Sequence, residues 1–405
     1  MPSSPSLGCF LALATVALGC QGDQSAVVPP PVDAGFGSLS AGLVHTCGVT
    51  VTNKLYCWGW NRDGAIGDGS HTDRVYAVRI GTTLSIGAVN TGGGHSCALT
   101  SGGVPYCWGL NLTGQVGDGS TASKAVPTAV AGGLTLSTLA SGGTFTCGLV
   151  AADSSAYCWG WGRDGELGSR PTETCPTDDG PEPCSRTPIA VSGVLRFVAI
   201  VAGIRHTCAL VADSTAYCWG RNDAGQLGNG TTTDTAGPVV VSGGYKFAAL
   251  TAGFSHTCGL TAAGDAYCWG DNSFGQVGAL SVSQAAEPML VGGGVVFREV
   301  SAGSEHTCGV SQGNAAWCWG YNGNNELGTE SLETCTPATI PVPCSHRPVA
   351  VTTTQSFASI SGGGHHTCAV TTGGRAYCWG NNSNGQLGTG NRSGSSVPVV
   401  VANQP

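Results

Sequence analysis

The sequence has little charge, and most of that charge is negative. Only 10% of its 405 residues are Asp, Glu, Lys or Arg, and 24 acidic residues against 16 basic ones give a formal net charge of −8. Proteins that bind nucleic acids neutralise phosphates with clustered Lys and Arg side chains. No basic stripe of that kind is present, so we do not expect a nucleic-acid partner.

Signals for helices and for catalytic sites are also scarce. No stretch shows the 3.6-residue hydrophobic period of an amphipathic helix. There is no nucleophile elbow and no pair of carboxylates suited to acid–base chemistry. Glycine-rich segments such as 117–119 lack the Lys and the helix that a phosphate-binding loop needs. We therefore predict that the protein is not an enzyme and carries no cofactor and no metal.

Glycine and cysteine are abundant instead, with 66 and 20 residues. Both recur in a unit of about 50 residues that reads Gly-x-x-His-Thr-Cys, then a turn, then Tyr-Cys-Trp-Gly-x-Asn and finally Gly-Gln-Leu-Gly. The first cysteine of each unit is Cys47, Cys97, Cys147, Cys208, Cys258, Cys308 or Cys368. A unit of this size cannot bury its apolar face alone and has to stack on copies of itself.

The pattern inside each unit is typical of short strands separated by turns. In the fifth unit we expect strands over 247–250, 256–261 and 266–269, with 289–291 starting the next blade. Four strands per unit predict an all-β, seven-bladed β-propeller. Because 397–401 supplies an opening strand with no unit after it, we expect the ring to be closed by pairing this C-terminal strand with the first blade.

The repeats carry a family resemblance. Residues 267–278, Tyr-Cys-Trp-Gly-Asp-Asn-Ser-Phe-Gly-Gln-Val-Gly, and the matching segment 377–388 resemble the repeat signature of the regulator-of-chromosome-condensation family. The resemblance covers roughly residues 36 to 401 and implies a seven-bladed propeller. It says less about function, because one fold hosts many unrelated sites.

The cysteines divide into pairs. Each blade pair brackets a turn between antiparallel strands, where opposed side chains lie close enough for a disulfide. We predict the disulfides Cys47–Cys57, Cys97–Cys107, Cys147–Cys158, Cys208–Cys218, Cys258–Cys268, Cys308–Cys318 and Cys368–Cys378, and Cys175–Cys184 and Cys335–Cys344 in two inserted loops, 170–188 and 330–348. Zinc binding and pairing between neighbouring blades are the alternatives.

The N-terminus predicts export. Residues 1–19 resemble a signal peptide, and 17–20, Ala-Leu-Gly-Cys, resemble a bacterial lipoprotein cleavage box in which Cys20 is lipidated. Residues 20–34 form a Pro-rich tether, and 35–405 form the propeller. We expect an exported protein, held at the bacterial outer membrane or cell surface or released as an unlipidated secreted product. A misplaced start codon is the remaining alternative.

Two repeated residue types are interpreted as structural. A ring of imidazoles could bind a metal, but Phe145 takes the same position in the third unit, which favours packing or hydrogen bonding. The seven tryptophans that follow the second cysteine are interpreted as core. The residues concerned are His45, His95, His206, His256, His306 and His366, and Trp58, Trp108, Trp159, Trp219, Trp269, Trp319 and Trp379.

Two positions vary between otherwise matching units. The first slot directly follows Trp-Gly, and the second slot is the pair of residues between Gly and His. Aromatic and Arg side chains are enriched at binding hot spots, so these rings predict a binding surface, with neutral drift on exposed turns as the alternative. The predicted binding residues are Trp60, Trp161, Arg221, Asp271 and Tyr321 in the first slot, and Arg205, Phe254 and Glu305 in the second.

Three functions follow from these patterns. The leading hypothesis is a monomeric, non-enzymatic interaction module that binds an unidentified protein through one face, similar in kind to the secreted propellers of this family that inhibit β-lactamases. The resemblance alone implies the alternative, a guanine-nucleotide exchange factor like the founding member. A photoreceptor-like dimer is the third, but Ile204 replaces the tryptophan of its Gly-Trp-Arg-His-Thr motif.

Overall fold

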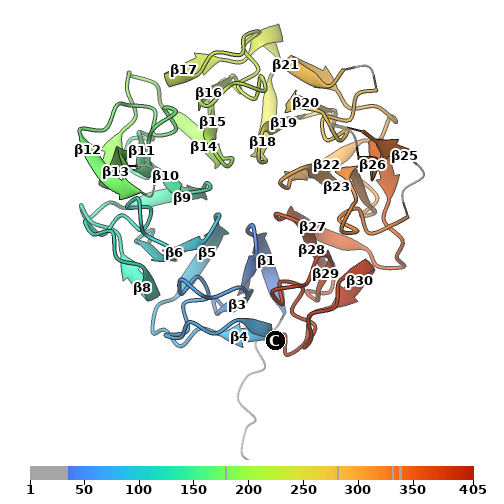
Figure 1. The fold of residues 1–405 in the computed structure, drawn as a ribbon, viewed down its shortest axis with the longest axis horizontal. Helices are drawn as coiled ribbons and strands as arrows, with labels where there is room; N and C mark the ends of the chain where they lie inside the picture. Colours follow the sequence, from blue (N-terminus) through green and yellow to red (C-terminus); the bar gives the residue numbers. More distant parts are fainter. Residues whose placement is uncertain (1–34, 178–179, 281, 331–332, 337–339) are drawn as a thin grey trace, which may run out of the picture. The chain divides into compact units, whose positions relative to one another are not determined.

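The computed structural model describes residues 35–177, 180–280, 282–330, 333–336 and 340–405. The expectations for the signal peptide, the tether and Cys20 lie outside these residues. Within the described part, the chain forms seven antiparallel sheets arranged radially around an axis (Figure 1). The prediction of an all-β, seven-bladed propeller is confirmed. None of the described residues forms a helix that is long and apolar enough to cross a membrane.

Each blade begins with the strand nearest the axis and runs outward. The first three blades consist of β1 (Phe36–Ala41), β2 (His45–Thr50), β3 (Leu55–Gly59) and β4 (Arg74–Arg79); β5 (Ile86–Thr91), β6 (His95–Thr100), β7 (Pro105–Gly109) and β8 (Lys124–Ala129); and β9 (Leu136–Ser141), β10 (Phe145–Val150), β11 (Ala156–Trp161), β12 (Glu173–Thr177) and β13 (Gly180–Ala190).

The remaining four blades repeat this plan, with a short 3-10 helix η1 (Ser242–Gly244) between two of them. They consist of β14 (Phe197–Ala202), β15 (His206–Val211), β16 (Ala216–Gly220) and β17 (Thr235–Val240); β18 (Phe247–Ala252), β19 (His256–Thr261), β20 (Ala266–Asp271) and β21 (Gln284–Leu290); β22 (Phe297–Ala302), β23 (His306–Ser311), β24 (Ala316–Tyr321), β25 (Glu333–Cys335) and β26 (Val342–Ala350); and β27 (Phe357–Gly362), β28 (His366–Thr371), β29 (Ala376–Gly380) and β30 (Ser395–Val400).

The predicted closure of the ring is wrong. β30, which contains 397–400, pairs with β29 inside the seventh blade, and the first blade has its own fourth strand, β4. For the same reason, Met289 belongs to the outer strand of the fifth blade and does not start the sixth. Each blade is therefore one continuous stretch of chain.

A buried asparagine after the third strand explains why the fourth strand returns to the same blade. Asn382 Oδ1 accepts the Leu387 N–H at 2.9 Å, and its Nδ2 donates to the Ser393 carbonyl oxygen at 2.9 Å. These bonds hold the loop folded and send the chain back along β29. Asn61 does the same in the first blade, through Ile66 N and Thr72 O.

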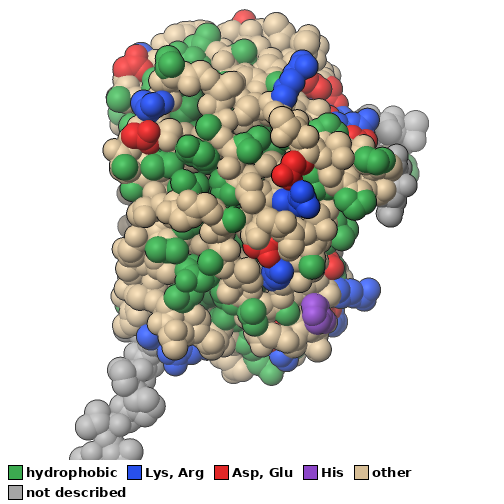
Figure 2. Space-filling view, turned by 90° about the vertical axis from the view of Figure 1, so that its left-hand side faces the viewer, with side chains coloured by type: hydrophobic (Ala, Val, Ile, Leu, Met, Phe, Trp, Pro, Cys, Tyr) green, Lys and Arg blue, Asp and Glu red, His purple; other side chains and the backbone are tan. Residues whose placement is uncertain are grey.

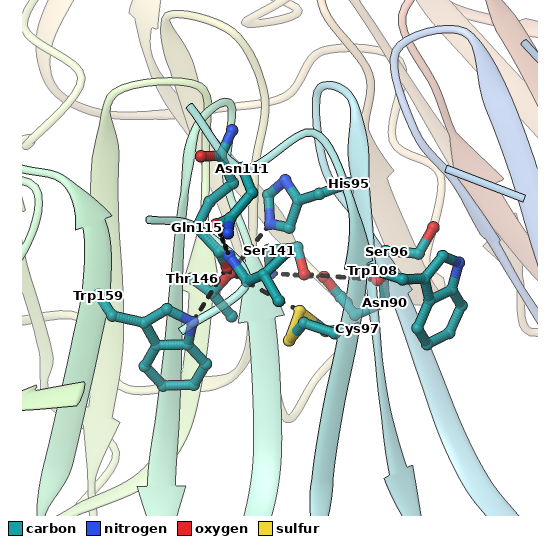
Figure 3. Close-up of a disulfide and its surroundings, with 12 residues drawn as sticks. Asn90, His95, Ser96, Cys97, Trp108, Asn111, Gln115, Ser141, Thr146 and Trp159 are labelled. Atoms are coloured by element: carbon teal, nitrogen blue, oxygen red, sulfur yellow. Dashed lines mark hydrogen bonds between the residues drawn. A yellow bond between two sulfur atoms is a disulfide. The ribbon is translucent and has the colours of Figure 1, made fainter. Parts of the chain in front are cut away.

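Neighbouring blades are joined by one polar arrangement that we call the joint (Figure 3). Between the second and third blades, the Gln115 carbonyl oxygen accepts hydrogen bonds from Trp159 Nε1 at 3.0 Å and Thr146 Oγ1 at 3.0 Å. The His95 Nε2 lies 2.9 Å from the same Thr146 oxygen. Since the threonine hydroxyl uses its only hydrogen on the carbonyl, the imidazole Nε2–H is the donor to Thr146.

The same joint occurs at all seven blade boundaries. Between the last blade and the first, the Gln386 carbonyl oxygen accepts Trp58 Nε1 at 2.9 Å and Thr46 Oγ1 at 3.1 Å, and His366 contacts Thr46 at 2.8 Å. The joint after the third blade lacks a histidine because Phe145 occupies its position. The ring is thus closed by side chains that repeat at every boundary, and the structural interpretation of the histidines and tryptophans is confirmed.

All nine predicted disulfides are present. In each blade the two cysteines are opposite each other on the second and third strands, as Cys258 and Cys268 are, with Cα atoms 4.0 Å apart. The blade cysteines are fully buried beside the tryptophans. The alternatives of zinc binding and of pairing between blades do not apply to these residues.

Burial of the histidines predicts a loss of stability in weak acid. Desolvation lowers the pKa of the six imidazoles from 6.5 to about 3 or 4. Below pH 6.5 the unfolded chain therefore binds protons that the folded chain does not, and the free energy of unfolding falls by up to about 1.4 kcal/mol per histidine and pH unit. Chemical denaturation at pH 7 and pH 5 measures this dependence.

A single variant isolates one histidine. His256→Phe copies the third blade. Between pH 7 and pH 5 its free energy of unfolding is expected to fall less than that of the parent protein, by the contribution of one histidine. At pH 7 the loss of the bond to Thr307 costs about 1 kcal/mol. Equal stability of the parent protein at pH 7 and pH 5 would contradict the account.

Candidate functional site

The two variable slots of each blade lie next to each other. The backbone N–H of the first-slot residue donates to the carbonyl oxygen of the second-slot residue, as in Trp161 to Thr144 at 3.0 Å and Tyr321 to Glu305 at 2.9 Å. Both slots therefore lie on one face of the propeller, which carries the turns between the first and second strands and the loops between the third and fourth. We call this the slot face.

A first cluster of slot residues spans the third and fourth blades. The guanidinium of Arg205 lies over the Trp161 ring, 5.9 Å from its centroid, and donates to Asp164 Oδ2 at 3.2 Å. Arg221 on the next first-slot position forms an ion pair with Asp223. Two of the predicted binding residues, Trp161 and Arg205, thus contact each other across the blade boundary, and Arg221 pairs with a residue of its own blade.

A second cluster lies on the sixth blade and its neighbours. The Tyr321 ring packs edge-on against Phe274, with centroids 5.0 Å apart, and lies 6.2 Å from the His365 ring. His365 Nδ1 is 3.3 Å from Glu326 Oε1, and this bond raises the pKa of His365. Desolvation raises the pKa of the nearby Glu305. Aromatic and titratable groups therefore share this part of the slot face.

The remaining predicted residues lie outside these two clusters. Asp271 accepts a hydrogen bond from Gln276 Nε2 at 3.0 Å, so its carboxylate supports its own blade. Phe254 is 46% exposed at the mouth of the axial cavity, and Trp60 is half-buried on the first blade. Their roles in binding remain predictions.

The axial cavity itself is narrow. Turns from all seven blades line it with mostly small residues, among them Gly92, Gly253 and Gly363, and its volume is about 70 Å³. Small-molecule sites usually have volumes of about 300–1,000 Å³. The axis is therefore too narrow to serve as a substrate pocket.

The two inserted segments form β-hairpins that extend the slot face. β13 pairs with β11 in the third blade and is also one arm of a hairpin with β12, which Cys175–Cys184 closes. In the sixth blade β26 and β25 repeat this arrangement around Cys335–Cys344. Because Trp161 pairs with Cys184 and Tyr321 with Cys344, each hairpin adjoins a first-slot aromatic residue. Figure 1 shows the hairpins on opposite sides of the ring.

Each hairpin borders an open pocket against the preceding blade. The pocket at the first hairpin, about 420 Å³ in volume, is lined by Leu110, Leu112, Thr113, Gln115, Thr144, Trp161, Pro176, Thr177 and Arg205. The pocket at the second hairpin, about 430 Å³, is lined by Asn272, Ser273, Leu280, Val282, Ser283, Thr334, Cys335, Thr336 and His346. Of the predicted binding residues, Trp161 and Arg205 line the first pocket and none lines the second, where only the predicted disulfide cysteine Cys335 appears.

One group of side chains resembles a metal site in composition. Cys335, Cys344 and His346 have ligand atoms within 4.8 Å of one another. The two sulfurs form a disulfide, and a metal would require thiolates. These residues therefore do not make a metal site.

The sequence and the fold match known proteins. The family model described as RCC1-like domain matches residues 135–405, and the model of the regulator of chromosome condensation (RCC1) repeat matches residues 38–65. The chain belongs to the RCC1 repeat family. The ultraviolet-B receptor UVR8 of Arabidopsis thaliana is 32% identical over 225 residues, which are 54% of this chain and 49% of the receptor. The match therefore spans about half the length of that relative.

Solved structures show the same RCC1 propeller fold. Prp20p from Saccharomyces cerevisiae has a TM-score of 0.74 at 21% identity, with 92% of this chain and 88% of Prp20p covered. Human WBSCR16 has a TM-score of 0.75 at 18% identity, with 86% and 94% covered. At these identities the likeness supports the fold alone.

One position of this RCC1 propeller changes its chemistry where the hairpins occur. The residue whose carbonyl oxygen forms the joint is Gln in four blades, but Glu166 and Glu326 replace it in the third and sixth. Glu326 accepts bonds from Asn324 and His365. Glu166 accepts the Asp164 N–H at 2.9 Å, but its buried Oε1 has no partner among the described residues, and desolvation raises its pKa to about 8.

Glu166→Gln is expected to stabilise the protein at alkaline pH. The folded state binds the Glu166 proton between about pH 4.5 and 8 while the unfolded state releases it, so the free energy of unfolding falls as pH rises through this window. The amide removes this penalty and keeps the bond from Asp164. The gain, on the order of a few kcal/mol at pH 8 and small at pH 5, is measured by urea denaturation.

Glu326→Gln is the matched control for this prediction. The control loses the charged partner of His365, so no stabilisation is expected at pH 8. An equal effect of the two substitutions at both pH values would show that the environment of Glu166 is not the cause.

Proposed function

We propose that this RCC1 propeller is a non-enzymatic protein-interaction module that binds a partner protein through the slot face. The observation that supports this proposal is the contrast between the joints and the slots. All seven joints use the same tryptophan and hydroxyl bonds to a carbonyl oxygen, and six of them add the histidine bond, whereas the slots next to them hold Trp, Leu, Arg, Asp, Tyr and Asn. Trp, Tyr and Arg are the residue types that dominate binding energies at interfaces.

The outer surface is less suited to recognition. On the side of the ring near β12 and β13, basic and acidic side chains lie beside one another among polar and apolar atoms (Figure 2). On β12 and β13 the Arg186–Glu173 ion pair has both partners exposed to solvent. Exposed pairs contribute little free energy. The proposal therefore places the partner on the slot face rather than on the outer surface.

The relatives are consistent with an interaction role. The yeast RCC1 protein Prp20 is described in complex with Kap60, and another structure of it is described together with its binding to Gsp1p and histones. Family membership also suggests nucleotide exchange as an alternative. No contact in the described residues favours that alternative over binding alone.

We further propose that the protein works outside the cytoplasm, at the bacterial cell envelope or as a secreted protein. Nine disulfides in a chain of 405 residues suit an oxidising compartment. Lipidation of Cys20 is part of this proposal and is tested by the mass of the mature N-terminus.

Simultaneous replacement of Trp60, Trp161 and Tyr321 by Ala tests the proposed surface. We expect the affinity for a partner isolated from the native envelope fraction to fall at least about a hundredfold, because truncation of a hot-spot residue, a class enriched in Trp and Tyr, costs about 2 kcal/mol or more. Calorimetric titration with the purified partner measures the loss, and unchanged thermal unfolding shows that the fold is intact.

The control replaces apolar residues on the opposite face. Val51 and Val104 are exposed in turns between second and third strands, so the double Ala variant is expected to keep full affinity. Unchanged affinity of the triple variant, or an equal loss in this control, would refute the proposed surface.

A further inference from the structure

The pocket at the first hairpin contains hydrogen-bond donors that have no acceptor. Gln115 is fully buried, and its Nε2 has no partner among the described residues. Trp161 is half-buried, but its indole Nε1 is buried and also has no partner there. Both residues line the pocket. An unpaired buried donor costs about 1–3 kcal/mol. A ligand that offers acceptor atoms at this place would remove that cost.

The other blades show why the Gln115 amide has no partner. Gln276 Nε2 donates to the first-slot Asp271 at 3.0 Å, and Gln386 Nε2 donates to the first-slot Asn381 at 3.0 Å. Gln226 Nε2 reaches Asp223, two positions after the first slot, at 3.3 Å. In the second blade these two positions hold Leu110 and Leu112, which cannot accept a hydrogen bond.

Two acceptors that line this pocket are already occupied. Gln115 Oε1 accepts bonds from both the N–H and the hydroxyl of Thr113, and the Thr144 carbonyl oxygen accepts the Trp161 N–H. No carboxylate is among its described lining residues. Arg205 also lines the pocket, and its charge is balanced by Asp164. The pocket thus combines free neutral donors with the apolar surfaces of Leu110, Leu112 and Pro176.

We propose that this pocket binds an apolar peptide segment of the partner, in which main-chain carbonyl oxygens accept from both Gln115 Nε2 and Trp161 Nε1 while a side chain packs against the two leucines. Neutral amide and indole donors pair well with a neutral carbonyl. The volume of about 420 Å³ is in the range of small-molecule sites. The inference rests on the proposed function, because it assigns one anchor point within the slot face.

The probe for this site is N-acetyl-leucine methylamide, which offers two carbonyl oxygens and one apolar side chain. Nuclear magnetic resonance follows the indole N–H signals during a titration at millimolar concentrations, and Trp161→Phe identifies the Trp161 signal. We expect this signal to shift saturably. The signals of the seven core tryptophans, which already donate to carbonyl oxygens, are expected to stay in place.

Leu110→Asn is the decisive variant because it gives Gln115 the internal acceptor that Asn381 provides in the seventh blade. Leu110→Val removes similar packing without adding an acceptor and is the matched control. We expect the asparagine variant to bind the probe about fivefold more weakly than the valine variant, which is the effect of one neutral hydrogen bond. The thermal unfolding of both variants shows whether they are folded.

Two results would overturn the inference: no saturable shift of the Trp161 signal, or equal affinity of the two Leu110 variants. Neither result would touch the proposed function, which is judged by the partner affinity of the variant that lacks Trp60, Trp161 and Tyr321. Conversely, probe binding without any effect of that triple variant on partner affinity would show a peptide-binding pocket that the partner does not use, and it would refute the proposed surface.

Discussion

The structure depends on a carbonyl oxygen that accepts two hydrogen bonds from the next blade. A tryptophan indole and a threonine or serine hydroxyl donate to it at every boundary, and in six of the seven boundaries a histidine from the preceding blade donates to that hydroxyl. All of these groups are buried, so an incomplete set costs more free energy than a lost contact at the surface. The joint fixes the distance and rotation between blades, and seven equal steps close the ring.

Because the joint uses few atoms, the residue types at neighbouring positions can differ from blade to blade. Phe145 shows that even the histidine can be replaced by an apolar ring of similar shape. The slots lie directly beside the joint, on backbone that the joint and the blade disulfide hold in place. Side chains such as Trp161 and Tyr321 therefore reach the solvent from rigid positions, which lowers the entropy lost when a partner binds.

The repeat predicted much of the fold. The cysteine pairing followed from the period, because a cysteine on each of two adjacent strands recurs at the same place in every unit. The blade boundaries did not follow. A cyclic repeat reads the same wherever it is cut, so 397–401 fitted the first blade as well as the seventh. The buried Asn382 folds the loop before β30 so that β30 pairs with β29, and the hydrogen bonds that show this are visible only in the structure.

The candidate site was predictable in part. Comparison of the units identified Trp161 and Arg205 as variable residues, but not their stacking across a blade boundary, since that contact depends on side-chain packing. Gln115 was not identified, because the same position holds glutamine in three other units and the comparison singled out positions that vary. One signal could have identified Gln115. The second unit has leucine at positions 110 and 112, whereas the other units with this glutamine have a hydrogen-bond acceptor at one of the two corresponding positions.

The most direct test of the account is hydrogen–deuterium exchange of the propeller with and without its isolated partner. We expect binding to slow exchange in the slot-face segments 60–66, 110–116 and 161–167, while the turns of the opposite face, such as 51–54 and 101–104, exchange as before. Slower exchange confined to those opposite turns would show that the partner binds the other face and would contradict the account.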